Sequence, residues 1–429
     1  MKEFYYPERA QWDEILERPT QSLKEIRKTV EPILEQVQSG GDAALLELTQ
    51  KFDKVQIDDL LVGEDEIHAS TAEVSEELQK AIQTAAQNIR RFHEAQRVPP
   101  IKMETMQGVL CERKSVAIPK VGLYIPGGTA PLFSTVLMLA IPAAIAGCKE
   151  IVLCSPPNKE GKLHPAILYA AKVAGITKIV KVGGAQAVAA MAYGTETVPK
   201  VDKIFGPGNQ YVTAAKQLVS LDGVAIDMPA GPSEVLVYAD GNADPAFIAA
   251  DLLSQAEHGI DSQVVFITRD AALLDPLQKE IYAQLREISR WEIADRCLQN
   301  SAVIILREEE EVIDMINTYA PEHLIFLCEN AREMADQIGN AGSIFLGYYT
   351  PESAGDYASG TNHTLPTNGA ARAYSGVSLD SFVKNITYQE ITEEGIQLLG
   401  PSVEIMAEAE SLQAHKNAVT VRLNKLKNK

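Results

Sequence analysis

The stretch VGLYIPGG at residues 121–128 decides the fold class of this chain. It is a short apolar run that ends in a proline- and glycine-rich turn, and similar apolar runs follow it, separated by helical stretches of about 10 to 15 residues. The later runs are residues 151–154, 179–182, 235–238, 264–268, 303–306, 324–327 and 344–346. Alternation of this kind predicts βαβ units and parallel sheets, so we expect an α/β protein. A single open sheet rarely contains so many strands, so we predict two doubly wound, incomplete Rossmann-like domains.

Glycine and proline clusters mark the expected domain boundaries. Residues 126–128 and 228–232 are such clusters, and they enclose a unit of about 100 residues, which suits one domain. We therefore predict an inserted second domain, a discontinuous first domain around it, and helical segments at both ends of the chain. The predicted ranges are 1–20 for an N-terminal arm, 21–123 and 233–377 for the first domain, 124–232 for the second domain, and 378–429 for a C-terminal helical dimerisation segment.

Two parts of the chain show helical spacing without strands between the helices. In residues 20–94, apolar residues recur at helix spacing, and Gly40-Gly41-Asp42 interrupts the pattern. After Tyr374 the spacing is helical again, and the tail from Ile405 to Leu426 is amphipathic. A terminal helix of this kind packs on another subunit or folds back on its own domain, and the pattern favours neither alternative.

Composition excludes some classes of partner. The 429-residue chain has 58 aspartates and glutamates against 39 lysines and arginines, a formal net charge of -19, whereas a nucleic-acid partner requires a basic face. The longest apolar run, residues 136–145, is too short to span a bilayer and contains Pro142. Residues 1–12 are charged and contain no apolar signal region. We therefore expect a cytoplasmic protein with no nucleic-acid partner and no membrane partner.

Four of the seven histidines lie in short polar stretches beside glycine, proline or carboxylates, namely His258, His323, His363 and His415. Neutral imidazole is the commonest metal ligand and the usual general base near neutral pH, so this set predicts a metal-assisted enzyme. The five cysteines are scattered and lack CxxC spacing, which indicates reduced thiols. Nitrogen and oxygen atoms must therefore hold any metal.

A helix is expected to begin at Asp244-Pro245, an N-cap followed by a first-turn proline, and to end at Gly259. Asp251, Gln255 and His258 fall at positions i, i+4 and i+7 of this helix. Gln255 and His258 would then share a face and could bind one ion through an amide oxygen and an imidazole nitrogen. The alternative is an ordinary polar helix end, where a histidine before a C-terminal glycine is common.

Glu322 and His323 follow Pro321 and precede an apolar strand. A carboxylate beside an imidazole offers two proton acceptors at one site, which suits a reaction whose two steps both release protons. Both side chains can serve one site only from an irregular turn, which Pro321 makes feasible. Ligands in open α/β sheets usually meet the carboxyl ends of strands, whereas this pair precedes its strand, so the pair alone is weak evidence.

Two further kinds of segment suggest ligands without specifying them. Residues 355–363 are rich in small and hydroxylic side chains, and Asp356 could supply an oxygen to a metal; a solvated surface loop is the alternative. Two glycine-rich turns, 183–186 and 206–209, follow strands and precede helices whose N-termini could receive a pyrophosphate. Neither turn is a GxGxxG and the chain contains no P-loop, so spacing alone does not establish NAD.

Over nearly its whole length the chain resembles the histidinol dehydrogenase family. The resemblance rests on an ordered series of segments: GDAAL at 41–45, GLYIPGG at 122–128, FGPGN at 205–209, AGPSE at 230–234, LSQAEHG at 253–259, APEHL at 320–324, the run 355–363, and AHKN at 414–417. It implies a cytoplasmic homodimer with a zinc ion in each subunit. The implied reaction is the oxidation of L-histidinol to L-histidine through L-histidinaldehyde with NAD, at the end of histidine biosynthesis.

The same resemblance implies a role for each matching residue. Gln255, His258, Asp356 and the partner subunit's His415 become zinc ligands. Glu322 and His323 become the proton-transfer pair, while Tyr124, Gln186 and Asn209 touch NAD. Ser233, His363 and the partner subunit's Glu410 join the zinc ligands and His323 in binding substrate.

Two other functional classes stay open. A zinc hydrolase would use a metal, a carboxylate and a histidine with an activated water to cleave an amide or an ester. A non-catalytic dinucleotide-binding protein would carry the same histidines incidentally. NADH absorbance on addition of histidinol separates all three classes.

Overall fold

The computed structural model describes residues 1–19, 23–127, 131–229 and 231–428. Parts of both predicted boundary clusters, 126–128 and 228–232, and the predicted boundary at residues 20 and 21 lie outside these residues. The chain divides into two compact units. The first consists of residues 1–95 and 118–381, and the second of residues 96–117 and 382–429.

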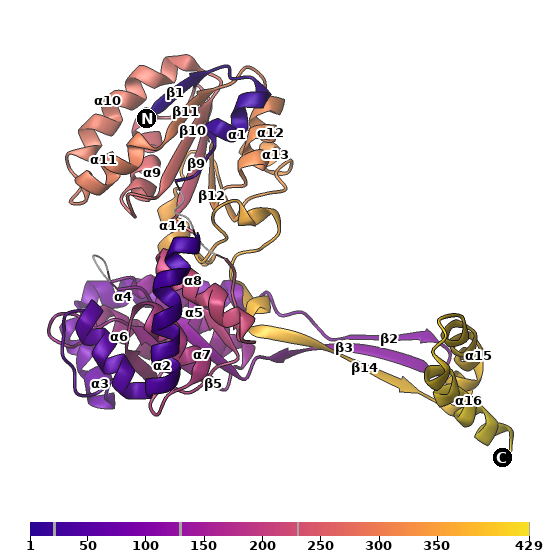
Figure 1. Cartoon of the computed structure of the whole chain (residues 1–429). Helices are drawn as coiled ribbons and strands as arrows, with labels where there is room; N and C mark the ends of the chain where they lie inside the picture. Colours follow the sequence, from indigo (N-terminus) through magenta and orange to yellow (C-terminus); the bar gives the residue numbers. More distant parts are fainter. Residues whose placement is uncertain (20–22, 128–130, 230, 429) are drawn as a thin grey trace. The chain divides into compact units, whose positions relative to one another are not determined.

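A six-stranded parallel sheet lies in the first unit (Figure 1). Its order is β1 (Lys2–Tyr5), β11 (Ala302–Ile305), β10 (Gln263–Thr268), β9 (Glu234–Ala239), β12 (His323–Leu327) and β13 (Ser343–Leu346). After the edge strand β1, the chain enters this sheet centrally at β9, adds β10 and β11 on the side of β1, and then returns to add β12 and β13 on the other side. The order therefore reverses between β9 and β12, as in doubly wound folds. β1, expected as part of an arm, is an edge strand of this sheet and pairs with β11.

Helices cover both faces of the six-stranded sheet. Alternate residues of β9 belong to different cores: Val235 and Val237 pack with α9, α10 and α11, whereas Leu236 and Tyr238 pack with α1, α12 and α13. The period of two in a strand places successive side chains on opposite faces, which explains the continuous apolar sequence of this strand. The helices are α9 (Pro245–Ala256), α10 (Leu274–Leu285), α11 (Trp291–Gln299), α1 (Trp12–Ile15), α12 (Glu309–Tyr319) and α13 (Ala331–Ala335).

The first unit contains a second parallel sheet, of five strands. Its order is β6 (Lys178–Lys181), β5 (Glu150–Ser155), β4 (Lys120–Tyr124), β7 (Lys203–Phe205) and β8 (Ala225–Ile226), which reverses between β4 and β7. The two doubly wound parallel sheets confirm the predicted fold class.

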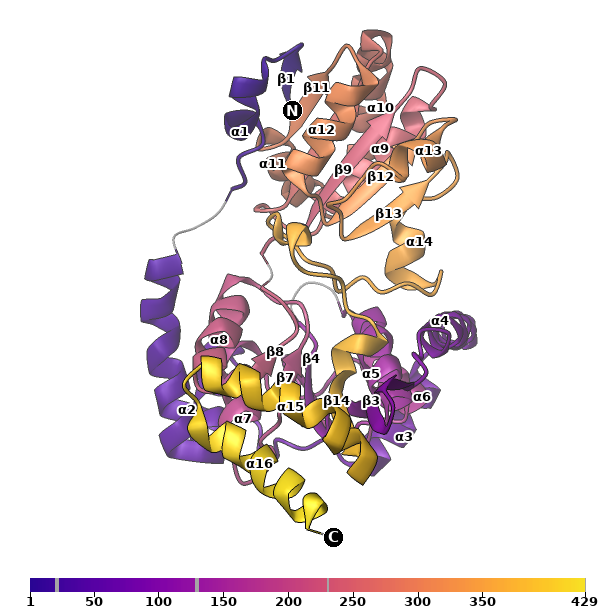
Figure 2. The same cartoon turned by 90° about the vertical axis from the view of Figure 1, so that its right-hand side faces the viewer.

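The N-terminal helices pack on the helices of the five-stranded sheet. α2 (Leu23–Phe52) contacts α7 (Gly184–Tyr193) and α8 (Gln210–Leu221), and Figure 2 shows α2 beside them. α3 (Glu64–Glu73) contacts α6 (Pro165–Ala174), and α4 (Glu76–Glu94) contacts α5 (Phe133–Ala146). The sequence assigned residues 21–123 to the domain of the other sheet; the predicted domain boundaries stay a prediction. The predicted interruption of the helix is present, because Gly41 has a left-handed φ of 53° inside α2.

The second unit combines a three-stranded antiparallel sheet with a helical hairpin. β3 (Val109–Ala117) pairs with β2 (Ile101–Met106) and with β14 (Val383–Ile391). α15 (Glu393–Ala409) and α16 (Gln413–Lys427) pack on each other. The helical C-terminal segment is therefore confirmed, but the sequence analysis missed the strand β14 that precedes it. Among all the described residues, no helix combines the length and the apolar character needed to cross a membrane.

Candidate active site

The segment from Ala320 to His323 brings two titratable side chains together. Ala320 has a left-handed backbone, φ 53°, which turns the chain at the end of α12. Glu322 follows in the turn, and His323 is the first residue of β12. Glu322 Oε2 lies 3.6 Å from His323 Nδ1. The irregular turn that the sequence required for a shared site is therefore present.

The backbone of Glu234 contacts both members of this pair. Its N–H donates to Glu322 Oε2 at 2.9 Å, and its carbonyl oxygen lies 3.3 Å from His323 Nδ1. Glu234 is the first residue of β9, and Arg18 Nη2 donates to its carboxylate at 2.9 Å. The site is thus built at the amino ends of β9 and β12, opposite to the edge where ligands usually bind in such sheets.

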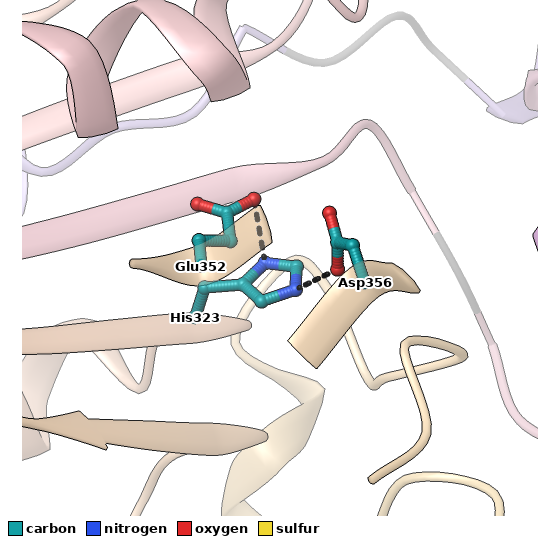
Figure 3. A group of neighbouring side chains, drawn as sticks. All are labelled: His323, Glu352 and Asp356. Atoms are coloured by element: carbon teal, nitrogen blue, oxygen red, sulfur yellow. Dashed lines mark ion pairs between the residues drawn. The ribbon is translucent and has the colours of Figure 1, made fainter. Parts of the chain in front are cut away.

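Two carboxylates flank the ring of His323 (Figure 3). Glu352 Oε1 lies 3.6 Å from Nδ1, and Asp356 Oδ1 lies 3.5 Å from Nε2. Both belong to α14 (Glu352–Tyr357), one helical turn apart, so one short helix supplies a carboxylate to each ring nitrogen. Ligand atoms of these three residues lie within 4.8 Å of one another, close enough to hold a metal ion.

The sequence analysis assigned no role to Glu352. A signal was present, because Glu352 precedes Asp356 by four positions and therefore shares its helical face. The segment 355–363 was treated as a loop, whereas residues 355–357 belong to α14. The helical register that links the two carboxylates was consequently not recognised.

Burial and mutual charge shift the pKa values in this cluster. Burial raises the pKa of Glu322 to about 8, and it raises the pKa of Glu352 well above its usual value. Burial alone would lower the pKa of His323, but the neighbouring carboxylates outweigh it and hold this pKa well above the ordinary value. Burial would raise the pKa of Asp356, but the adjacent His323 outweighs burial and lowers this pKa. Glu322, Glu352 and His323 thus tend to hold protons beside Asp356, which stays ionised. Such an arrangement is typical of acid–base sites.

Helix α9 carries the predicted metal-binding residues Gln255 and His258 to this region. The predicted start is correct, since Asp244 accepts a hydrogen bond from Ala246 N at 2.9 Å and Pro245 is the first helical residue. The predicted end is wrong: α9 ends at Ala256. Gln255 therefore lies in the last turn, and His258 follows the helix with its N–H donating to Gln255 O.

Gln255 and His258 differ in their surroundings. The Gln255 side chain is completely buried, and neither its Oε1 nor its Nε2 makes a hydrogen bond within the described part of the chain. His258, just after the end of α9, is exposed to solvent, and desolvation by the protein atoms around it lowers its pKa. The charge of Asp356 opposes this shift, and the charges of His323 and His363 add to it, so His258 lies near all three.

The two other predicted substrate contacts of this unit lie beside the cluster. His363 Nδ1 bonds the carbonyl oxygen of Asp356 at 2.8 Å, and its Nε2 bonds Thr135 Oγ1 at 3.0 Å. Protein atoms therefore fix both nitrogens of this ring. Ser233 immediately precedes Glu234 at the amino end of β9 and is partly buried.

The three predicted NAD contacts line one cavity of about 840 Å³. Tyr124 ends β4, Asn209 follows β7, and Gln186 lies in the first turn of α7. Tyr124 Oη accepts from Gly184 N at 3.2 Å, and Asn209 caps α8 by accepting from Tyr211 N and Val212 N. This cavity adjoins the carboxyl ends of β4 and β7, where the strand order reverses, which is the expected place for a ligand.

Glu410 and His415 belong to the second unit. Glu410 caps the C-terminal end of α15, and His415 lies in the first turn of α16. Both residues are exposed. The first unit therefore gathers Gln255, His258, Asp356, Glu322 and His323 without them.

Comparison with known proteins gives one consistent result. The family model described as histidinol dehydrogenase matches residues 16–423. The chain is 60% identical over 427 residues to a histidinol dehydrogenase of Bacteroides fragilis (strain YCH46), and the match covers 100% of both chains. It is 55% identical over 421 residues to a histidinol dehydrogenase of Vibrio cholerae, and that match covers 97% of this chain and 96% of the other. The crystal structure of histidinol dehydrogenase from Elizabethkingia anophelis has a TM-score of 0.97 and 54% sequence identity, covering 100% of this chain and 99% of that one.

Proposed function

Because the chain belongs to the histidinol dehydrogenase family of oxidoreductases, we propose that it oxidises L-histidinol to L-histidine through L-histidinaldehyde, in two NAD-linked steps that need zinc. The substrate is thus a small molecule from histidine biosynthesis, and the proposed location is the cytoplasm. The observation that carries the proposal is the buried contact between Glu322 and His323 beside Asp356, because it combines two proton acceptors with a metal-binding oxygen.

Gln255 offers a test of whether the site suits a metal ion. A buried amide without a hydrogen-bond partner costs about 1–3 kcal/mol, and a bound cation would satisfy its Oε1. Oxygen atoms of Gln255 and Asp356 and nitrogen of His258 form a donor set that zinc accepts. We propose these three residues as ligands, together with the partner subunit's His415.

Each residue of the proposed site has a distinct task. Bound zinc would orient the imidazole and amino nitrogens of the substrate, and bound NAD would accept hydride. In its neutral form, His323 takes the proton of the substrate hydroxyl in the first oxidation. Glu322 takes a proton from the water that adds to the aldehyde, which prepares the second oxidation. Ser233, His363 and the partner subunit's Glu410 hold the substrate, and Tyr124, Gln186 and Asn209 hold NAD.

The surface of the second unit supports the proposed homodimer. Large apolar side chains there are widely exposed, including Met103, Ile405, Met406 and Val421. Exposed apolar side chains in such number are typical of a surface that another protein covers. A second copy of the chain is the proposed cover, and it would bring its own Glu410 and His415.

Addition of histidinol to the protein with NAD and zinc tests the proposal. Production of NADH that requires both histidinol and His323 is expected, with His323→Asn as the matched variant. Hydrolysis of an ester or amide without NADH would instead support the zinc hydrolase. Binding of NAD without any turnover would support the non-catalytic class.

A further inference from the structure

Glu352 faces the ring nitrogen of His323 that lies away from Asp356. We propose that Glu352 is a positioning residue, which holds His323 in the tautomer with its proton on Nδ1 and thereby makes Nε2 the atom that accepts the substrate's proton. This inference rests on the proposed role of His323 as the base. Glu352 thereby gains a functional role that the sequence did not predict.

The surroundings of Nδ1 support this tautomer. Three acceptors face this atom: Glu234 O at 3.3 Å, Glu322 Oε2 at 3.6 Å and Glu352 Oε1 at 3.6 Å. A neutral imidazole carries one N–H, and the acceptor that faces a ring nitrogen determines where that proton lies. Nε2 has no hydrogen-bond partner within the described residues, although Asp356 Oδ1 lies 3.5 Å away. The lone pair of the neutral ring is therefore expected on Nε2.

Of the three acceptors at Nδ1, Glu352 is the one to which the proposed site gives no other function. The carbonyl oxygen of Glu234 is part of the backbone of β9, and Glu322 Oε2 already accepts a hydrogen bond from Glu234 N. The Glu352 side chain is only 2% exposed, and its Oε2 has no hydrogen-bond partner in the described part of the chain. Even when burial keeps the Glu352 carboxyl group protonated, its carbonyl oxygen can accept from Nδ1–H, and a buried acid group beside one ring nitrogen favours a positioning role.

Asp356 competes with Glu352 for the ring proton of His323. It is one turn from Glu352 on α14 and lies beside Nε2. Without Glu352, Glu234 O and Glu322 Oε2 would be the acceptors left at Nδ1, and the same helix would present a carboxylate only to Nε2. The ring proton would then lie on Nε2 in more of the molecules, where His323 is a donor in place of a base, and the first oxidation would slow.

Two substitutions of Glu352 distinguish the loss of its hydrogen-bond acceptor from the loss of its negative charge. Glu352→Leu removes the acceptor, whereas Glu352→Gln removes the charge and keeps an oxygen that can accept from Nδ1–H. The expected loss in kcat is about 100-fold for the leucine variant, within the range of general-base catalysis, and much smaller for the glutamine variant. Because neither substitution touches the NAD cavity, KM for NAD should stay unchanged. Asp251→Asn is the matched control, since Asp251 is a buried carboxylate on α9.

The tautomer itself can be read by ¹⁵N NMR of histidine-labelled protein at alkaline pH, with and without zinc. His323→Asn identifies the signals of His323. The parent, Glu352→Gln and Asp251→Asn should show an unprotonated Nε2, and Glu352→Leu should show the proton moved toward Nε2. Zinc content and thermal stability are measured on the same samples.

Three results decide the matter. Unchanged kcat and tautomer in Glu352→Leu would overturn the inference while leaving the proposed function intact. Loss of zinc from Glu352→Gln would also overturn it, because Glu352 would then be a metal ligand. Full turnover by His323→Asn would refute the base assignment itself. If Glu352→Leu does not fold, Glu352→Ala, which also removes the acceptor, takes its place: a ring proton moved toward Nε2 with a lower kcat supports the inference, and an unchanged kcat and tautomer overturn it.

Discussion

Replacing Glu322 by Gln should remove the pH dependence of the second oxidation. Burial raises the pKa of Glu322 to about 8, and the opposing charge of His323 and the hydrogen bond from Glu234 N do not cancel this effect. A general base acts in its ionised form, so the active fraction should rise from roughly one tenth at about pH 7 to roughly nine tenths at about pH 9. The rate of aldehyde oxidation should therefore increase roughly ninefold over this interval in the parent.

The assay supplies histidinaldehyde directly and follows NADH at each pH. Glu322→Gln is nearly isosteric, and its amide oxygen can still accept from Glu234 N, so the variant should fold. It should show a slow and nearly pH-independent second oxidation, while the first oxidation of histidinol is affected less. A variant that oxidises the aldehyde as fast as the parent, with the same pH profile, would refute the assignment of Glu322 as the base for water.

Three further predictions concern the metal, the dimer and the NAD cavity. Chelation should abolish turnover and zinc should restore it without unfolding, and His258→Ala should lower the zinc content; full occupancy in that variant would remove His258 from the ligand set. Mixing Glu322→Gln with His415→Ala chains should restore roughly one quarter of parental activity, because about half of the dimers are mixed and each has one intact site of two. If the subunits are shown to have exchanged and the mixture stays inactive, the partner subunit does not contribute to the site. Gly206→Ala should destabilise by about 1–3 kcal/mol and weaken NAD binding, because a Cβ there meets Tyr124 O at 2.1 Å with φ at 131°; unchanged thermal unfolding and NAD titration would refute this.

The parallel sheets could be predicted because burial on both faces makes their strands continuously apolar. β9 is one example, since all of its residues are buried between two layers of helices. The antiparallel strands gave no such signal. β2 has the sequence IKMETM and every residue in it is exposed, and β3 carries Glu112, which pairs with Lys102 and Lys114. Polar, exposed strands of this kind resemble loops in sequence.

Residue types and turn chemistry predicted part of the site. The adjacent pair Glu322-His323 and the cap at Asp244-Pro245 depend on local sequence, and both were found where the sequence indicated an irregular turn and a helix start. The spacing of Glu352 and Asp356 indicates a shared helical face, but the contact of Glu352 with His323 joins α14 to β12, and local patterns do not reveal that tertiary contact. The end of α9 was also missed, because Gly259 was taken as the terminator although the chain leaves the helix at Ala256.

The stoichiometry of the reaction tests the central claim most directly. A known, limiting amount of histidinol is converted with excess NAD and zinc, NADH is quantified by absorbance, and the product is identified by mass spectrometry. We predict two NADH for each histidinol consumed, with histidine as the product and no free aldehyde. Recovery of one NADH for each histidinol, with the aldehyde released, would contradict the account, because Glu322 would then have no second oxidation to serve.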